Sequence, residues 1–269
     1  MNDIIKYPRT RHIEGSRLQK GDEDLKSERF ETIRGKYLVL EEKIDGANSG
    51  ISFSPDGKLL LQSRGHFLNG GYGEKQFDLF KTWASVYESS LYELLGSRYI
   101  MYGEWMYAKH TIFYDNLPHY FMEFDIYDKE KHLFLSTKER RNMLKNYSFI
   151  SSVRVLYEGR IESLEELTSY LGPSAFRTER CLETLKQQSK KCGLSEDLVL
   201  SQTDQKNLME GIYIKEEDDK HVIDRYKFVR ASFLTSIANS ETHWADRPIV
   251  PNLLGHGFDL FDSGNGVQD

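Results

Sequence analysis

The chain has 269 residues, of which 39% are hydrophobic and 29% charged, and its formal net charge is −6. This composition is typical of a globular protein that is long enough to bury a sizeable core. No run of 18 apolar residues occurs and the first twenty residues are polar, which argues against a membrane span or signal peptide and predicts a cytoplasmic location. The two cysteines, Cys181 and Cys192, are too few for a disulfide framework or a four-cysteine zinc site, so we expect free thiols.

The acidic balance also limits the contacts that the chain can make with nucleic acid. A protein that coats a long phosphate backbone is usually basic, because its cations replace the condensed counterions. The densest basic stretch here lies within residues 177–191, and a solvated helix face explains it without any ligand. Any nucleic-acid footprint is therefore expected to be short or local.

The first half of the chain alternates between strand and helix patterns. Residues 1–35 are polar and broken, and the β-prone residues 37–41 predict a strand that ends near Lys43. Residues 51–53 and 59–61 flank a Pro-Asp-Gly turn, which predicts a hairpin. Apolar residues at three- and four-residue steps over 77–94 predict one helix. Two aromatic-rich runs, 99–107 and 120–127, predict further strands.

The second half begins with helical signals. Ser136 and Ser163 each precede a glutamate by three residues, a capping-box pattern that predicts a helix start at both places. A third helix is expected after Pro173, and strands are expected again at 211–215 and 222–229. Strands at both ends with a helical middle predict an α+β fold.

The most informative segment is residues 42–48, which read Glu-Lys-Ile-Asp-Gly-Ala-Asn. Lys43 stands between two carboxylates, a setting that suits an amine with a chemical task. A free lysine has a pKa of roughly 10.4, so an amine that attacks phosphorus at neutral pH needs a lower one, supplied by burial or by a nearby cation. The ordinary alternative is a solvated lysine at the end of a strand.

Two late cations are candidates for the role of that neighbour. Arg225 and Lys227 alternate along one expected strand, so both side chains should point to the same face. There they would neutralise phosphate oxygens and lower the pKa of Lys43 by like-charge repulsion. The wet face of a strand is the ordinary explanation for this pair.

Four further residues suit the binding of a nucleotide. The rigid fork of Arg64 fits ribose or phosphate, and Phe124 offers a ring that can stack on a base. Glu104 and Glu210 are able to hold ribose hydroxyls or a magnesium ion, which prefers a few carboxylates together with phosphate oxygens. Each residue taken singly also fits a core, an edge strand or a hairpin end, and it is their order along the chain that favours a shared site.

These motifs resemble those of the covalent lysyl-nucleotidyltransferase superfamily, which includes DNA ligases, RNA ligases and mRNA capping enzymes. The ordered signals are Lys-x-Asp-Gly at 43–46, Ser-Arg at 63–64, Gly-Glu at 103–104, Phe-Asp at 124–125, Glu-Gly at 210–211 and the cations at 225–227. Within that superfamily the chain is most similar to RNA ligases of the phage double-strand-repair type, because Asn48 follows the lysine by five residues.

The resemblance implies ATP, a divalent metal (Mg²⁺ or Mn²⁺) and three chemical steps. AMP would first join Lys43, then pass to an RNA 5′-phosphate, and a 3′-hydroxyl would finally displace it. It also implies roles for single residues: Lys43 as nucleophile, Lys227 and Arg225 at the phosphate, Glu210 at the metal, Asn48 at the RNA end, and Glu42, Arg64, Glu104, Phe124 and Lys215 around the nucleotide. Arg225 stands where the family often has lysine, and Arg11–Ser16 resembles a segment at the mouth of the cleft.

The implied fold is an antiparallel-sheet nucleotidyltransferase fold of the DNA-ligase adenylation type, unrelated to ATP-grasp, over residues 1–230. A helical insertion is expected at about 137–209, and residues 231–269 form a C-terminal extension that is too short for an oligonucleotide-binding barrel. The helical insertion or an accessory RNA-binding protein would then grip the RNA. Alternative functions are a DNA ligase or capping-type guanylyltransferase on the same scaffold, a non-catalytic nucleotide- or RNA-binding module, and a magnesium hydrolase that leaves Lys43 unexplained.

Overall fold

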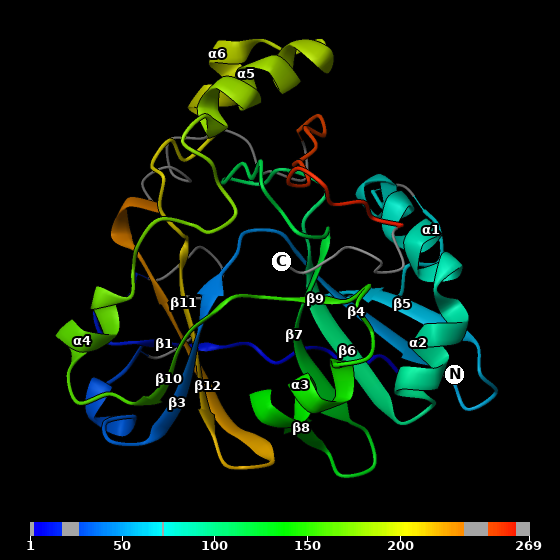
Figure 1. Cartoon of the computed structure of the whole chain (residues 1–269), viewed down its shortest axis with the longest axis vertical. Coiled ribbons are helices and arrows are strands. Elements are labelled where there is room, and N and C mark those ends of the chain that lie inside the picture. Colours follow the sequence, from blue (N-terminus) through cyan, green and yellow to red (C-terminus); the bar gives the residue numbers. More distant parts are fainter. Residues whose placement is uncertain (1–2, 18–26, 72, 234–246, 262–269) are drawn as a thin grey trace.

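The structure is a computed structural model, and it describes residues 3–17, 27–71, 73–233 and 247–261. Mixed α/β architecture surrounds one large, mainly antiparallel sheet (Figure 1). The strands are β1 (Arg11–Ile13), β2 (Ser27–Glu28), β3 (Tyr37–Lys43), β4 (Ala47–Phe53), β5 (Leu59–Ser63), β6 (Tyr99–Trp105), β7 (Phe121–Asp128), β8 (Leu133–Leu135), β9 (Ser151–Ser152), β10 (Val155–Arg160), β11 (Gly211–Glu217) and β12 (His221–Val229).

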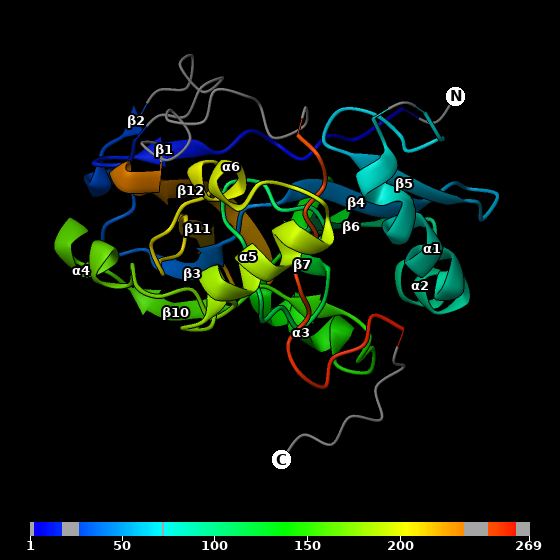
Figure 2. The same ribbon diagram turned by 90° about the horizontal axis from the view of Figure 1, so that it is seen from above.

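The helices lie on the outside of this sheet and at its upper end (Figure 1). They are α1 (Asp78–Val86), α2 (Glu88–Leu95), α3 (Thr137–Leu144), α4 (Leu164–Ser169), α5 (Cys181–Lys191) and α6 (Glu196–Ser201), with short 3₁₀ turns at Phe30–Thr32 and Lys75–Phe77. Seen from above, α5 and α6 project onto the middle of the molecule, between the two halves of the sheet (Figure 2).

The sheet has two halves that share a central connection. Its strand order is β10-β3-β11-β12-β8-β7-β6-β4-β5. In addition, β1 pairs with β12, β2 pairs with β1, and β9 pairs with β7. The short strand β8 pairs with both β12 and β7, and so joins the half that carries Lys43 to the half that carries Phe124. Residues from distant parts of the sequence therefore face one another across the middle of the sheet.

Apolar packing holds each half in place. Trp83 and Phe80 of α1 pack against Trp105 and Phe121 of the β6–β7 hairpin, and all four side chains are fully buried. A second cluster packs β3, β11 and β12 against α4 and the turn at Phe30. At roughly 25 cal/mol per Å² of apolar surface, these clusters are the main favourable term in the stability of the fold.

Most of the predicted elements are confirmed. The strand ending at Lys43, the hairpin, both aromatic strands and the two late strands all form, and the side chains of Ser136 and Ser163 accept hydrogen bonds from Glu139 N and Glu166 N. The single helix predicted over 77–94 is wrong, because the chain breaks at Tyr87 between α1 and α2. The backbone angles of Tyr87, φ −98° and ψ 16°, depart from helical values, although the apolar spacing continues across the break.

The middle of the chain is less helical than the sequence predicted. Between α3 and α4 the chain forms β9 and β10, and β10 pairs antiparallel with β3 along the residues before Lys43. The half-polar pattern of β10 carries no strong strand signal, so tertiary pairing determines its structure. The helix expected after Pro173 begins only at Cys181.

Candidate active site

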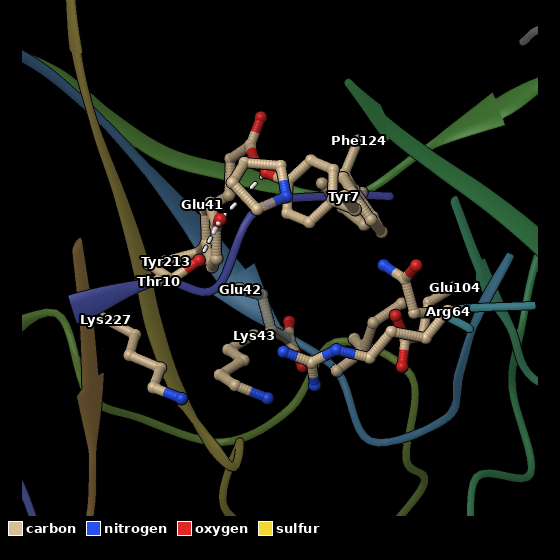
Figure 3. Close-up of a pocket in the computed structure, with 14 residues that line it drawn as sticks. Tyr7, Thr10, Glu41, Glu42, Lys43, Arg64, Glu104, Phe124, Tyr213 and Lys227 are labelled. Atoms are coloured by element: carbon tan, nitrogen blue, oxygen red, sulfur yellow. Dashed lines mark hydrogen bonds between the residues drawn. The ribbon is translucent and has the colours of Figure 1, made fainter. Parts of the chain in front are cut away.

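A pocket with about 740 Å³ of empty space, counted to its open mouth, lies between the two halves of the sheet (Figure 3). Lining residues come from nearly every element around it: Tyr7, Pro8, Thr10, Glu41, Glu42, Lys43, Ile44, Asn48, Arg64, Glu104, Phe124, Val153, Tyr213 and Lys227.

Lys43 lies at the end of β3, directly opposite the start of β11. The antiparallel register pairs Lys43 with Gly211, so Glu210 is carried to the same end of the sheet. The Lys43 Nζ donates a hydrogen bond to the Glu210 carboxylate at 2.7 Å. Glu210 is almost fully buried, whereas the lysine side chain is 22% exposed, so the amine is reachable from the pocket.

The prediction that cations lower the pKa of Lys43 is wrong for this structure. Burial alone would lower the pKa, but the carboxylates of Glu210, Glu104 and Asp45 more than offset it, and the pKa of Lys43 is raised. The physical reason is that acidic groups, and not Arg225 or Lys227, dominate the electrostatics around Lys43. The amine is therefore an ammonium at neutral pH until the local charge changes.

Glu104 shares this crowded environment. Burial raises its pKa to about 8, and although Lys43 lowers it, the neighbouring Glu210 and Asp45 act in the same direction as burial. In the register of the sheet, Glu104 on β6 pairs with Asn48 on β4, so the two side chains enter the pocket from adjacent strands. Gly46 fits beneath them, because an added Cβ there would lie 2.6 Å from the Met106 sulfur and 2.8 Å from the Trp105 carbonyl oxygen.

The turn after Lys43 is held by a loop that the sequence did not point to. The Asp45 carboxylate accepts hydrogen bonds from Thr111 N at 2.7 Å and Ile112 N at 2.8 Å, and Asp45 N donates to the Tyr114 hydroxyl at 2.9 Å. Three hydrogen bonds thus fix the backbone direction just beyond the lysine. Asp45 has a structural task here, because its carboxylate ties the turn to this loop.

The two late cations do not share one position. Lys227 lines the pocket (Figure 3). Arg225 lies on the same strand face but behind the pocket wall, with its guanidinium carbon 4.0 Å from the centroid of the Phe134 ring and a nitrogen 3.6 Å from Asp125. The register of the sheet explains this difference. Lys227 pairs with Tyr213, which also lines the pocket, whereas Arg225 pairs with the fully buried Lys215.

Lys215 and Glu42 are also engaged by protein groups. Lys215 is fully buried and its Nζ lies 3.1 Å from Asp125 and 2.9 Å from Glu41, so it is enclosed beneath the pocket. Glu42 lines the pocket, but its carboxylate accepts a hydrogen bond of 2.5 Å from the Ser174 hydroxyl, and burial raises its pKa. Both residues therefore have structural partners within the protein.

Arg64, Asn48 and Phe124 line the pocket together with Lys43, as the sequence predicted for one shared site. In place of the expected segment at 11–16, the preceding residues Tyr7, Pro8 and Thr10 form part of the wall, and no sequence motif marks them. Arg11–Ile13 forms β1 beside β12. Tyr213 was missed as well, although its alternation with Lys215 on an expected strand placed it on the same face.

The donor set around Lys43 bears on metal binding. Within the described ranges no group of three or more His, Cys, Asp or Glu side chains is arranged to hold a metal ion. Mg²⁺ is commonly held by only one or two carboxylates, with phosphate oxygens and water filling its other positions. Glu210 and Glu104, two carboxyl groups that both act on the pKa of Lys43, fit such a partial site.

Comparison with known proteins identifies the family. A family model described as RNA ligase matches residues 36–229. The chain belongs to the RNA ligase family. The match spans every motif from Lys43 to Lys227, and no curated protein matches the chain.

Solved structures of an RNA ligase from Naegleria gruberi are similar in fold to this RNA ligase family member. One mutant form without ligand and one mutant form with ATP and Mn each give a TM-score of 0.51 at 16% sequence identity, over 78% of this chain. The chain spans about half of their length, 54% and 53% respectively. At this identity the likeness concerns the fold. No helix among the residues described is both long and apolar enough to cross a bilayer.

Proposed function

We propose that this chain is an ATP-dependent RNA ligase of the phage double-strand-repair type, which joins RNA 5′-phosphate and 3′-hydroxyl ends in the cytoplasm. The observation that carries the proposal is the position of Lys43, whose amine is partly exposed in the pocket with Glu210 at 2.7 Å on one side and Lys227 on the same pocket wall. Family membership supports it, and so does the likeness in fold to a Naegleria gruberi RNA ligase that was solved with ATP and Mn.

In the first step Lys43 would attack the α-phosphorus of ATP. A bond forms between Nζ and phosphorus, the bond from phosphorus to the pyrophosphate oxygen breaks, and pyrophosphate leaves with its electron pair. The ammonium must lose a proton before it attacks, and a cation that offsets the charge of Glu210, which raises the pKa of Lys43 from 2.7 Å away, would favour that loss. Lys227 would offset the charge that develops on the phosphate oxygens.

The base would lie at the aromatic end of the pocket. The ring centroids of Phe124 and Tyr213 are 6.5 Å apart with an interplanar angle of 33°. Both residues line the pocket, so either ring offers a surface on which a purine can stack. Arg64 at the other end of the pocket is suited to the ribose or phosphates, and its guanidinium supplies several donors in one plane.

A divalent metal would be held by Glu210 and Glu104. When bound, it supplies positive charge that offsets these carboxylates and the phosphates of the nucleotide. Asn48 lies on the strand beside Glu104 and would contact the RNA end that receives AMP. Arg225 and Lys215 would act from behind the wall, by holding Asp125 beneath the base site.

The proposed domain organisation follows from the roles assigned to the pocket residues above. Residues 1–230 would form a nucleotidyltransferase domain, and the helical part of the middle, α5 and α6, would contact RNA, alone or with an accessory protein. Residues 231–269 would form an extension, of which 250–255 packs on the loop that holds Asp45.

Incubation with ATP and Mg²⁺ tests the chemistry. We expect the intact mass to rise by one AMP, the adduct to map to Lys43, and Lys43→Ala to abolish it. Pre-adenylylated RNA should be sealed without ATP, even by Lys43→Ala, because that step no longer needs the nucleophile. An adduct on another lysine would remove the proposed nucleophile, labelling by GTP would indicate a capping-type enzyme, and sealing of DNA ends alone would indicate a DNA ligase.

A further inference from the structure

Tyr7 lines the pocket and contacts both of its aromatic walls, Phe124 and Tyr213. It belongs to the N-terminal segment, outside the residues that match the RNA ligase family model, and its side chain is 8% exposed. Its ring meets the Phe124 ring edge-on, with centroids 5.1 Å apart and an interplanar angle of 73°. Its hydroxyl oxygen lies 2.8 Å from the Tyr213 hydroxyl oxygen (Figure 3). One side chain thus touches both walls.

The hydroxyl groups around Tyr7 form a chain whose direction can be derived. The Tyr7 hydroxyl donates its single proton to Asp125 Oδ2 at 2.5 Å. The Tyr7 oxygen must then accept from Tyr213, whose own proton is used in this bond. The Tyr213 oxygen in turn accepts from Thr10 Oγ1 at 2.7 Å. The order of donation is therefore Thr10 to Tyr213 to Tyr7 to Asp125.

The acceptor at the end of this chain is fixed and charged. Burial alone would raise the pKa of Asp125, but Lys215, Arg225 and Arg140 more than offset it, so the pKa is lowered and the carboxylate stays ionised. Burial raises the pKa of Tyr7 well above its ordinary value and that of Tyr213 to about 12, so both phenols keep their protons. A charged acceptor strengthens the bond that it receives, and the remaining bonds of such a chain polarise one another.

The segment that carries Tyr7 is itself anchored. The Ile5 carbonyl accepts hydrogen bonds from Gln62 Nε2 at 2.9 Å and from the Tyr102 hydroxyl at 2.7 Å, which tie it to both β5 and β6. The Tyr7 ring packs edge-on against Tyr102, with centroids 5.2 Å apart. Tyr7 is therefore held against one half of the sheet by its ring and joined to the other half by its hydroxyl.

We propose that Tyr7 is a positioning residue that sets the separation of the Phe124 and Tyr213 rings, and that Thr10 assists it by fixing the Tyr213 hydroxyl from the other side. The inference rests on the proposed function, because it assigns these two rings to the binding of the adenine of ATP and of adenylylated RNA. Tyr7 acts through the two walls, so its loss should weaken nucleotide binding and leave the chemical step nearly unchanged.

Kinetics of lysyl-AMP formation in the full chain test this inference. Tyr7→Phe keeps the ring and removes the hydroxyl, and we expect the KM for ATP to rise about five- to tenfold, as for one buried hydrogen bond, with the maximal rate changed less than twofold. Thr10→Val should raise KM by a smaller factor, and Thr10→Ser should restore it, because serine keeps the hydroxyl. Tyr92→Phe, at a half-exposed ring far from this chain of hydroxyls, is the matched control.

Two further measurements separate the base site from the phosphate site. The KM for pre-adenylylated RNA should rise in Tyr7→Phe, because the same adenine must contact these rings. The pyrophosphate concentration that half-saturates reversal of lysyl-AMP should not change, because the nucleotide is then already attached. Thermal melting checks folding, and the Thr10→Val and Thr10→Ser pair still tests the inference if Tyr7→Phe does not fold.

An unchanged KM for ATP in Tyr7→Phe or Thr10→Val proteins that melt like the wild type would overturn the inference. A fall in the maximal rate at constant KM would overturn it as well, since that pattern belongs to a group acting in the chemical step. These results differ from failure of the proposed function, in which the wild-type protein itself forms no lysyl-AMP.

Discussion

The Lys43 ammonium and the Glu210 carboxylate form a 2.7 Å ion pair across the paired strands β3 and β11. Since Gly211 lies directly opposite Lys43, this contact follows from the register of the sheet and from the Glu-Gly order at the start of β11. The pair keeps the amine charged. Activation of Lys43 therefore requires a change in the charge around Glu210, such as the binding of a cation.

This pair predicts a shift in the pH dependence of AMP transfer. Because Glu210 raises the pKa of Lys43, Glu210→Gln should lower it, and the rising limb of the rate profile should move to lower pH. The maximal rate should fall at least about tenfold, or ~1.4 kcal/mol of barrier, because the proposed metal ligand is lost. Single-turnover formation of lysyl-AMP between about pH 6 and 9 measures both effects. A limb at the wild-type position would contradict the assignment, and Glu93→Gln on the exposed face of α2 is the control.

Glu104 makes a separate prediction about stability. Its pKa is raised from 4.5 to about 8, chiefly by burial, with Glu210 and Asp45 acting in the same direction against Lys43. Between these two pH values the folded protein holds a proton that the unfolded chain has lost, so the free energy of unfolding should decrease as pH rises. Glu104→Gln should flatten this decrease. Urea unfolding of both proteins without ligands, at several pH values from about 4.5 to 8, measures the difference, and parallel curves would refute the assignment.

Lys227 and Arg225 should separate in their effects. Lys227 lines the pocket, so Lys227→Ala should slow AMP transfer at least about tenfold with little change in stability. Arg225 lies between Asp125 and the Phe134 ring, so Arg225→Ala should lower the free energy of unfolding by about 1–3 kcal/mol. Urea unfolding and single-turnover labelling, done on both variants, distinguish the two positions. Equal loss of rate without loss of stability in both would place Arg225 at the phosphate.

The sequence predicts a pocket residue where a short motif contains a side chain with a chemical role. Lys43, Glu104 and Lys227 stand at fixed places on strands, and period-two alternation then determines which side chains share a face. Whether a side chain on that face lies in the pocket or behind its wall was not predictable. Arg225 and Lys227 differ by one alternation step, yet pairing with Lys215 or with Tyr213 decides whether the cation is behind the wall or in the pocket.

The remaining features depend on contacts between distant parts of the chain. Tyr7 reaches Asp125, 118 residues away, through one hydroxyl, and no local pattern encodes such a contact. The direction of the pKa shift of Lys43 was mispredicted for the same reason, because Glu210 and Glu104 come close only in the folded sheet. The fold class was accessible from strand and helix signals, whereas β10 and the break at Tyr87 depend on tertiary packing.

The C-terminal part supplies the last prediction, through Asn252. This residue is fully buried, its Oδ1 accepts from Tyr114 N at 2.9 Å, and its Nδ2 donates to the Met106 carbonyl at 2.7 Å. It thereby closes the loop whose amides hold Asp45. Asn252→Ala leaves a buried donor and a buried acceptor unpaired, so we expect the free energy of unfolding to fall by about 2–4 kcal/mol.

Lysyl-AMP formation should also slow in Asn252→Ala, because the turn after Lys43 loses its support. Urea unfolding and single-turnover labelling measure the two effects, and Asn146→Ala, at an exposed position after α3, should change stability by less than about 0.5 kcal/mol. In a double-mutant cycle with Asp45→Asn, the two substitutions should be less than additive in rate, since both loosen the same turn. Fully additive effects would show that Asn252 stabilises the fold independently of Asp45.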